Sequence, residues 1–227
     1  MISPESIGNS KSTVRRNRAL GAATLLSMVI ALWAAFIYAP TEATMGDLQR
    51  IFYIHVPAAI VGFIAAIVVA FASVMFLIKR DLKWDRLAVS NAELCVLFVS
   101  TAMLMGSIWA KPAWGVWWVW DARGTLEFAL WLIFVAYLLL RHYVSNPTKR
   151  ASVSAVFGIL GAIDVPINYM SIEWYRTQHP SHVIGSGSDS KLDPDMRIAL
   201  AICFVFVILL YTYLLTRRIE LEKLKSE

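Results

Sequence analysis

Long apolar segments are the feature that most constrains the fold of this chain. A helix needs about 20 mostly apolar residues to cross a hydrocarbon core about 30 Å thick. Six segments approach or exceed this length, and each is continuous rather than alternating, which favours helices over strands. They cover residues 20–39, 56–78, 87–108, 126–140, 151–169 and 198–215. We therefore predict an all-α integral membrane protein, a bundle of six transmembrane helices in a single membrane domain over residues 1–227.

The segment 126–140 is the shortest of the six, but Trp131, Phe134 and Tyr137 make it strongly apolar. We expect it to draw its outer turn from the tryptophan-rich loop at 109–125, which we place at the membrane interface. The first segment is full-length and is followed by further spans, so we expect it to be retained rather than cleaved as a signal peptide. Composition agrees with a membrane protein, since 58% of residues are hydrophobic and only 16% are charged.

Basic residues are unevenly distributed between the connecting segments. Of the 21 Lys and Arg residues, 15 lie in the N-terminal tail, residues 79–86, residues 141–150 and the C-terminal tail, and 6 lie in the other three loops. The side richer in Lys and Arg is normally cytoplasmic. We therefore predict a multi-pass membrane protein with both termini in the cytoplasm and the other three loops on the outer side of the membrane. Because the basic residues flank the membrane, we expect no nucleic-acid partner.

Two outer loops carry histidines that can bind a metal. His55 lies where the first outer loop meets the second span, just before Pro57, and His179 and His182 lie in the third outer loop. Imidazole is a common ligand of haem iron, and two imidazoles from opposite loops can approach one iron from opposite faces. Spacing leaves His179 and His182 as alternatives. His142 lies on the inner side and is most simply a solvated interfacial residue.

The second outer loop, residues 109–125, is unusually rich in tryptophan. An aromatic belt at the membrane interface explains one or two tryptophans but not the five at Trp109, Trp114, Trp117, Trp118 and Trp120. A helix over 114–123 places Trp114, Trp117, Trp118 and Asp121 on one face, and a flat porphyrin can stack on such a shelf.

Charged residues of the outer loops suggest how such a ligand is held. Lys111, Arg123 and Arg176 are the cations placed to pair with haem propionates. We expect Asp121 to anchor the loop by bonding to Arg123 or to backbone N–H groups rather than to touch the ligand.

The stretch Trp-Gly-Val-Trp-Trp-Val-Trp-Asp-Ala-Arg at 114–123 resembles the WWD signature of the haem-handling proteins of cytochrome c maturation, the CcmC/CcsA/CcmF superfamily. Within it, the chain is most similar to the six-span CcmC family in span number, topology, the segment Ile54–Ala59, and Glu173-Trp174-Tyr175 before His179. One departure is Gly124, where the family motif usually has leucine. A glycine at that position is expected to loosen the start of the following helix.

The resemblance implies specific roles and partners. It implies that His55 and His179 are axial ligands of a transiently and non-covalently bound haem b. It also implies a haem platform and chaperone contact formed by Trp114, Gly115, Trp117, Trp118, Trp120, Asp121 and Arg123. The implied partners are a periplasmic haem chaperone similar to CcmE, a small membrane subunit similar to CcmD, and ABC-type subunits similar to CcmA and CcmB. The resemblance also implies that the spans contact the lipid bilayer of the bacterial inner membrane and that the outer loops face the periplasm.

These observations favour a non-enzymatic protein that binds haem at the outer face and delivers it to a periplasmic chaperone. The chain has neither a P-loop for ATP hydrolysis nor the C-x-x-C-H motif of covalent haem attachment, and Cys95 and Cys203 are expected to be apolar fillers. One alternative is a cytochrome c haem lyase of the wider WWD group. A second is a small-solute transporter that uses the intramembrane acids Glu93 and Asp164.

Overall fold

The computed structural model describes residues 4–180 and 192–225, which fold almost entirely into helices. Among these residues, six helices are long and apolar enough to cross a membrane. They are α1 (Pro4–Trp33), α2 (Phe52–Lys79), α3 (Leu82–Trp114), α4 (Ala122–Tyr143), α5 (Pro147–Trp174) and α6 (Pro194–Leu224). Two short elements, the π-helix η1 (Ala34–Tyr38) and the 3-10 helix η2 (Asp47–Ile51), lie between α1 and α2. The predicted membrane fold and its six spans are confirmed.

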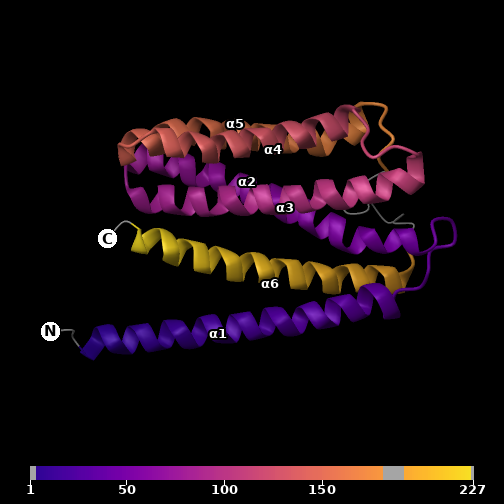
Figure 1. The fold of residues 1–227 in the computed structure, drawn as a ribbon, viewed down its shortest axis with the longest axis horizontal. Helices are drawn as coiled ribbons and strands as arrows, with labels where there is room; N and C mark the ends of the chain where they lie inside the picture. The colour runs from indigo at the N-terminus through magenta and orange to yellow at the C-terminus, as the bar shows by residue number, and fades with distance from the viewer. Residues whose placement is uncertain (1–3, 181–191, 226–227) are drawn as a thin grey trace.

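The helices run side by side in a flattened bundle (Figure 1). α2 and α3 lie in the middle, α4 and α5 pack on one side of them, and α6 followed by α1 lies on the other. Both termini and the α2–α3 and α4–α5 connections lie at one end, which we call the terminal end. The α1–α2 and α3–α4 connections, the end of α5 and the start of α6 lie at the opposite end, which we call the loop end.

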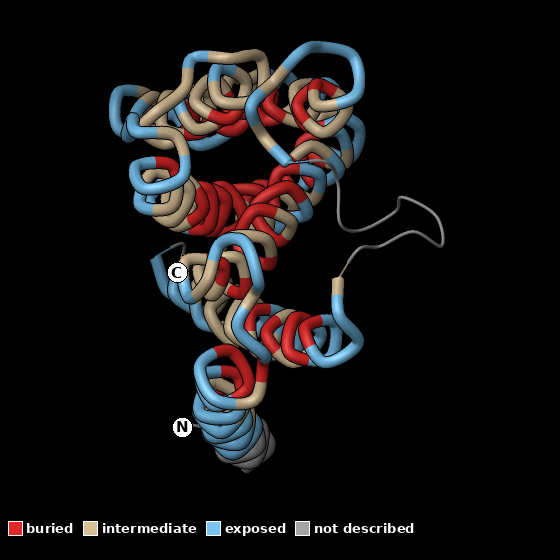
Figure 2. The backbone as a smooth tube through the Cα atoms, turned by 90° about the vertical axis from the view of Figure 1, so that its right-hand side faces the viewer, coloured by how far each residue is buried: buried red, intermediate tan, exposed pale blue. Residues whose placement is uncertain are grey.

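Burial follows this arrangement (Figure 2). In the most apolar window of each helix, 56% of the residues of α3 are buried, compared with 22% for α1. Helix α1 packs chiefly against α6 and exposes large apolar side chains such as Leu25, Leu26 and Val29. In a membrane protein such a face contacts lipid, so α2 and α3 form the protein core and α1 its edge.

The central helices approach closely because glycines face their neighbours. A Cβ added at Gly62 of α2 would lie 2.9 Å from Cγ2 of Val99 in α3, and one at Gly161 of α5 would lie 2.6 Å from the Phe134 ring of α4. Small residues at such contacts let helix backbones approach closely in a membrane, where packing rather than hydrophobicity drives association.

Ion pairs join neighbouring helices near the terminal end. The Arg141 guanidinium of α4 donates two hydrogen bonds to the Asp85 carboxylate of α3, at 2.7 and 2.8 Å. Arg218 of α6 pairs with Glu93 of α3. Glu93, which sequence reasoning considered for solute coupling, is therefore engaged in a contact between helices.

Helix α4 extends beyond its predicted bounds at both ends. It begins at Ala122, four residues before the predicted span, and ends at Tyr143. As expected, its outer turn comes from the tryptophan-rich segment. Cys95 and Cys203 are free thiols, both buried in the helix packing.

Candidate functional site

His55 lies at the loop end of α2, against α3. The helix begins at Phe52, so His55 sits in its first turn and Pro57 follows it inside the helix. The Nδ1 atom of His55 lies 2.9 Å from the backbone oxygen of Ala102 in α3. A carbonyl oxygen only accepts hydrogen bonds, so the proton of the neutral ring is on Nδ1 and the lone pair is on Nε2.

His179 follows the end of α5 and reaches the same place. Its ring centroid lies 6.3 Å from that of His55, with the two ring planes inclined by 37°. Its Nδ1 lies 2.9 Å from the Pro180 oxygen, so the same reasoning places its lone pair on Nε2. Burial, the positive charge of Arg123 and the neighbouring His55 lower the pKa of His179 to about 4. The ring is therefore neutral near pH 7 and able to bind a metal ion.

Asp121 connects the tryptophan-rich loop to the segment that carries His179. One carboxylate oxygen accepts a hydrogen bond from the Gly124 N–H at 2.8 Å and caps the N-terminus of α4. The other accepts from the Gln178 N–H at 3.1 Å. Asp121 thus fixes the residue next to His179 while it starts α4, and its bonds to backbone N–H groups are those that the sequence suggested.

The positive charge of Arg123 acts on the imidazoles of both His55 and His179. Its guanidinium donates to the backbone oxygen of Asn168 at 2.9 Å and lies over the Phe63 ring, 5.4 Å from the centroid. The carboxylate of Glu127 is 4.0 Å from Nη2. The side chain is only 12% exposed. A cation held in this way is a fixed positive charge near the two rings, suited to an anionic ligand group.

The tryptophans do not form the single helical face that a helix over 114–123 would produce. Helix α3 ends at Trp114, and Gly115 adopts φ +80°, a left-handed conformation that ends the helix and favours glycine. Trp114 therefore packs edge-on against Trp109, with centroids 4.8 Å apart. Trp118 contacts Trp120, which contacts Phe128 of α4. The helix considered over 114–123 is not formed, because α3 ends at Trp114 and α4 begins only at Ala122. The segment between them is a loop, as predicted for residues 109–125.

The aromatic side chains still gather near the loop end. Trp117 and Trp120 are 60% and 67% exposed, whereas Trp118 is partly buried. The indole N–H of Trp118 is buried with no hydrogen-bond partner among the described residues. Buried donors are normally paired, so this N–H is available to a ligand acceptor.

The family model for Heme exporter protein C, CcmC, matches residues 4–227. The chain belongs to this family. It is 34% identical over 196 residues to Heme exporter protein C of Bradyrhizobium diazoefficiens, covering 86% of this chain and 74% of that protein. It is 32% identical over 203 residues to the Escherichia coli K12 protein of the same name, covering 87% and 80%. A putative cytochrome c biosynthesis ccmC-like mitochondrial protein of Marchantia polymorpha is 30% identical over 201 residues.

The structure brings together some of the candidate site residues and separates others. His55, His179, Asp121 and Arg123 are joined by the contacts above. The Lys111 ammonium instead donates to the Gly115 oxygen at 2.9 Å, and Arg176 is exposed. His182 lies outside the described residues.

Gly124, where the CcmC motif usually has leucine, does not loosen the start of α4 as the sequence suggested. A Cβ at this position would lie 2.3 Å from the Val119 backbone oxygen. In this chain the missing side chain lets the tryptophan-rich loop close against the first turn of α4, so the glycine tightens the packing here.

Several residues around the site were not singled out from the sequence. Asn168 is buried, donates from Nδ2 to Glu127 at 3.1 Å, and offers its backbone oxygen to Arg123. Ala102 supplies the oxygen that orients His55. A backbone carbonyl leaves no trace in residue identity, so the readable signals were the polar side chains inside apolar segments, Glu127 and Asn168.

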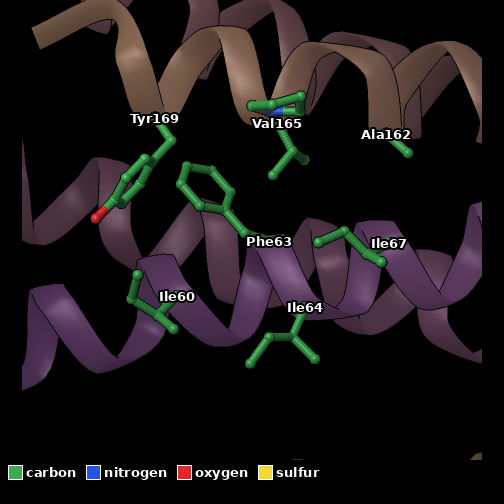
Figure 3. Close-up of a pocket in the computed structure, with 8 residues that line it drawn as sticks. Ile60, Phe63, Ile64, Ile67, Ala162, Val165 and Tyr169 are labelled. Atoms are coloured by element: carbon green, nitrogen blue, oxygen red, sulfur yellow. The ribbon is translucent and has the colours of Figure 1, made fainter. Parts of the chain in front are cut away.

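An apolar groove of about 520 Å³ lies between α2 and α5 (Figure 3). Its lining comprises Ile60, Phe63, Ile64, Ile67, Ala162, Val165, Pro166 and Tyr169. Phe63 points into the space between the two helices and is also the ring beneath Arg123. The wall of the groove therefore adjoins the cation of the histidine site.

Proposed function

We propose that this protein binds haem non-covalently at the loop end of the bundle and delivers it to a periplasmic haem chaperone during cytochrome c maturation. The observation that carries the proposal is the pair of imidazoles, His55 and His179, whose Nδ1 atoms face backbone carbonyls. Membership of the Heme exporter protein C family supports haem as the cargo.

The separation of the two rings fits one metal ion between them. A metal–imidazole bond is about 2 Å long, so two imidazoles in trans on one metal have ring centres about 6 Å apart. The His55 and His179 centroids are 6.3 Å apart. Among the described residues no group of three or more His, Cys, Asp or Glu could hold a metal ion, which favours a two-imidazole site over a closed zinc site.

Residues near the loop end offer partners for the propionates and the ring of a porphyrin. Arg123 offers a fixed cation for a propionate, and the buried Trp118 N–H offers a second donor. Together with Trp114 and Gly115, the exposed Trp117 and Trp120 rings supply an apolar surface for the macrocycle or for the chaperone. The bound species is haem b, and two exchangeable imidazole ligands suit a cargo that is passed on.

The distribution of charge supports the orientation. With the Lys- and Arg-rich segments in the cytoplasm, both termini lie there, and the histidine site faces the periplasm. Handing haem to a chaperone similar to CcmE then takes place on the outer face of the inner membrane. A CcmD-like small subunit and CcmA- and CcmB-like subunits complete the transporter, with ATP hydrolysis assigned to the ABC subunits rather than to this chain.

A visible absorption spectrum with haem quantification tests the proposal. The wild type, His55→Ala, His179→Ala and His142→Ala would be purified in detergent after co-expression with the chaperone. His142 is the matched control, because its Nδ1 also faces a backbone oxygen, that of Leu138 at 3.1 Å, but in the last turn of α4 at the terminal end.

We expect the wild type and His142→Ala to carry haem with the same Soret and α bands. Both His55→Ala and His179→Ala should lose haem or show shifted bands, because each removes one iron ligand. A wild type without haem in the presence of the chaperone would contradict the function. Unchanged spectra in both variants would contradict the ligand assignment and direct attention to His182.

A further inference from the structure

The position of His55 depends on a glycine in the facing helix. A Cβ added at Gly106 of α3 would lie 3.2 Å from Cε1 and 3.5 Å from Nδ1 of the His55 ring. The first distance is tighter than an ordinary van der Waals contact, so a side chain at position 106 and the ring in its present position compete for the same space.

Gly106 lies one helical turn after Ala102, whose backbone oxygen is 2.9 Å from His55 Nδ1. In an α-helix the oxygen of residue 102 also receives the N–H of residue 106, so the two residues present one patch of backbone to α2. The imidazole reaches this oxygen across the bare Cα of Gly106.

Helix α2 has little freedom to move away and relieve such a contact. Seven residues further along α2, Gly62 packs against Val99, which is seven residues before Gly106 in the antiparallel α3. A Cβ at Gly62 would lie 2.9 Å from Val99 Cγ2, so the backbones are already close at that point. If position 106 carries a side chain, we therefore expect the His55 ring, rather than helix α2, to move.

We propose that Gly106 is a positioning residue for His55: it leaves the gap that lets the imidazole bond through Nδ1 to Ala102 and keep Nε2 for the ligand. The ligand in question is the haem iron of the proposed function, on which this part of the inference rests. The orientation of His55 in the ligand-free protein does not depend on that function and can be measured separately.

The first experiment uses haem titration of Gly106→Ala in the full chain. Alanine favours helix more than glycine does, so the variant should fold. Gly21→Ala is the matched control, since a Cβ there would lie 3.3 Å from the Tyr213 ring, about as close but between α1 and α6. Loss of an outer-sphere partner that orients a metal ligand lowers metal affinity by about 10–100-fold.

We expect Gly106→Ala to bind haem about 10–100-fold more weakly, with the spectrum of a protein that has lost one imidazole ligand. Added free imidazole should restore the wild-type bands, as it should for His55→Ala. The double variant should bind no more weakly than His55→Ala alone, because Gly106 acts through that ring. A wild-type spectrum and affinity in Gly106→Ala, or additive losses in the double variant, would overturn the proposal.

The second experiment separates this inference from the function. Nitrogen NMR of labelled histidines in haem-free protein reports which ring nitrogen carries the proton. His55 should be protonated at Nδ1 in the wild type and in Gly21→Ala, and should change in Gly106→Ala, whereas His142 stays the same. If the wild type fails to bind haem but His55 changes as described, only the function fails. If His55 keeps its Nδ1 proton in Gly106→Ala, the positioning role fails.

Discussion

Near the terminal end of the bundle, guanidinium groups pair with carboxylates on neighbouring helices, as Arg141 does with Asp85 and Arg218 with Glu93. At the loop end, the polar groups of the histidine site bond mainly to backbone, although the Glu127 carboxylate also lies 4.0 Å from Arg123 Nη2. His55 faces the Ala102 oxygen, Arg123 donates to the Asn168 oxygen, and Asp121 accepts two backbone N–H groups. The same types of side chain thus have different partners at the two ends.

The two kinds of partner suit two different roles. Pairs of side chains hold neighbouring helices together, and side chains bonded to backbone can also hold a ligand. A paired guanidinium and carboxylate satisfy one another and leave little charge for a third partner. A side chain that is bonded to backbone can still bind a further partner. A histidine does so through its second ring nitrogen, and an arginine through its positive charge. We therefore expect changes near the terminal end to alter stability, and changes at the loop end to alter ligand binding.

The largest effect on stability is expected for Asp85→Asn. The Asp85 and Arg141 side chains are 9% and 10% exposed, so the substitution leaves a nearly buried cation without its partner. Breaking such a pair reduces the free energy of unfolding by about 3–5 kcal/mol. Unfolding in mixed detergent micelles measures this loss. A shifted haem spectrum with unchanged stability would contradict the assignment of stability to the terminal end and ligand binding to the loop end.

A smaller loss is expected for Gly124→Ala at the loop end. The new Cβ would lie 2.3 Å from the Val119 oxygen, so the tryptophan-rich loop must move away from α4. Such overpacking reduces the free energy of unfolding by about 1–3 kcal/mol. Near-ultraviolet circular dichroism should also change, because Trp118 and Trp120 move with the loop. An unchanged spectrum would mean that the loop does not depend on Gly124.

Asp121→Ala should have a modest effect on stability and a larger one on ligand binding. It removes the cap of α4, which contributes about 0.5–2 kcal/mol, and releases Gln178 next to His179. Haem affinity should fall by more than the loss of stability explains. Asp121→Asn keeps an oxygen for the cap, so its stability and haem affinity should lie between those of the wild type and Asp121→Ala. Equal haem affinity in all three proteins would show that Asp121 acts only on the helix.

The smallest effect is expected for Glu93→Gln. The Arg218 guanidinium also pairs with Glu222 at 3.3 Å, so it keeps a counter-charge when Glu93 becomes an amide. Haem binding should not change. A solute-uptake activity that is lost in this variant, in a protein without haem, would instead favour the transporter alternative and make Glu93 more than a contact between helices.

Part of the site could be read from the sequence, and part could not. Histidines of the outer loops were predicted as ligands because imidazole is a common ligand of haem iron. Spacing left His179 and His182 as alternatives, and only the resemblance to the CcmC family favoured His179. The arrangement of the tryptophans could not be predicted from helical spacing, because Gly115 adopts a left-handed conformation that ends α3 before most of them. Gly106 and Ala102 were not identified, since a glycine and an alanine inside an apolar helix look like ordinary packing residues.

The sequence by itself determined the six spans and which segments share a membrane face, because bilayer thickness fixes the length of an apolar helix and the charge of the loops differs between the two sides. Only the tertiary structure decided how the polar groups are used. It set the 6.3 Å between the His55 and His179 rings, directed Asp121 to Gln178, and engaged Glu93 with Arg218. These contacts depend on how closely particular helix backbones approach, and that distance arises from packing between segments far apart in the chain.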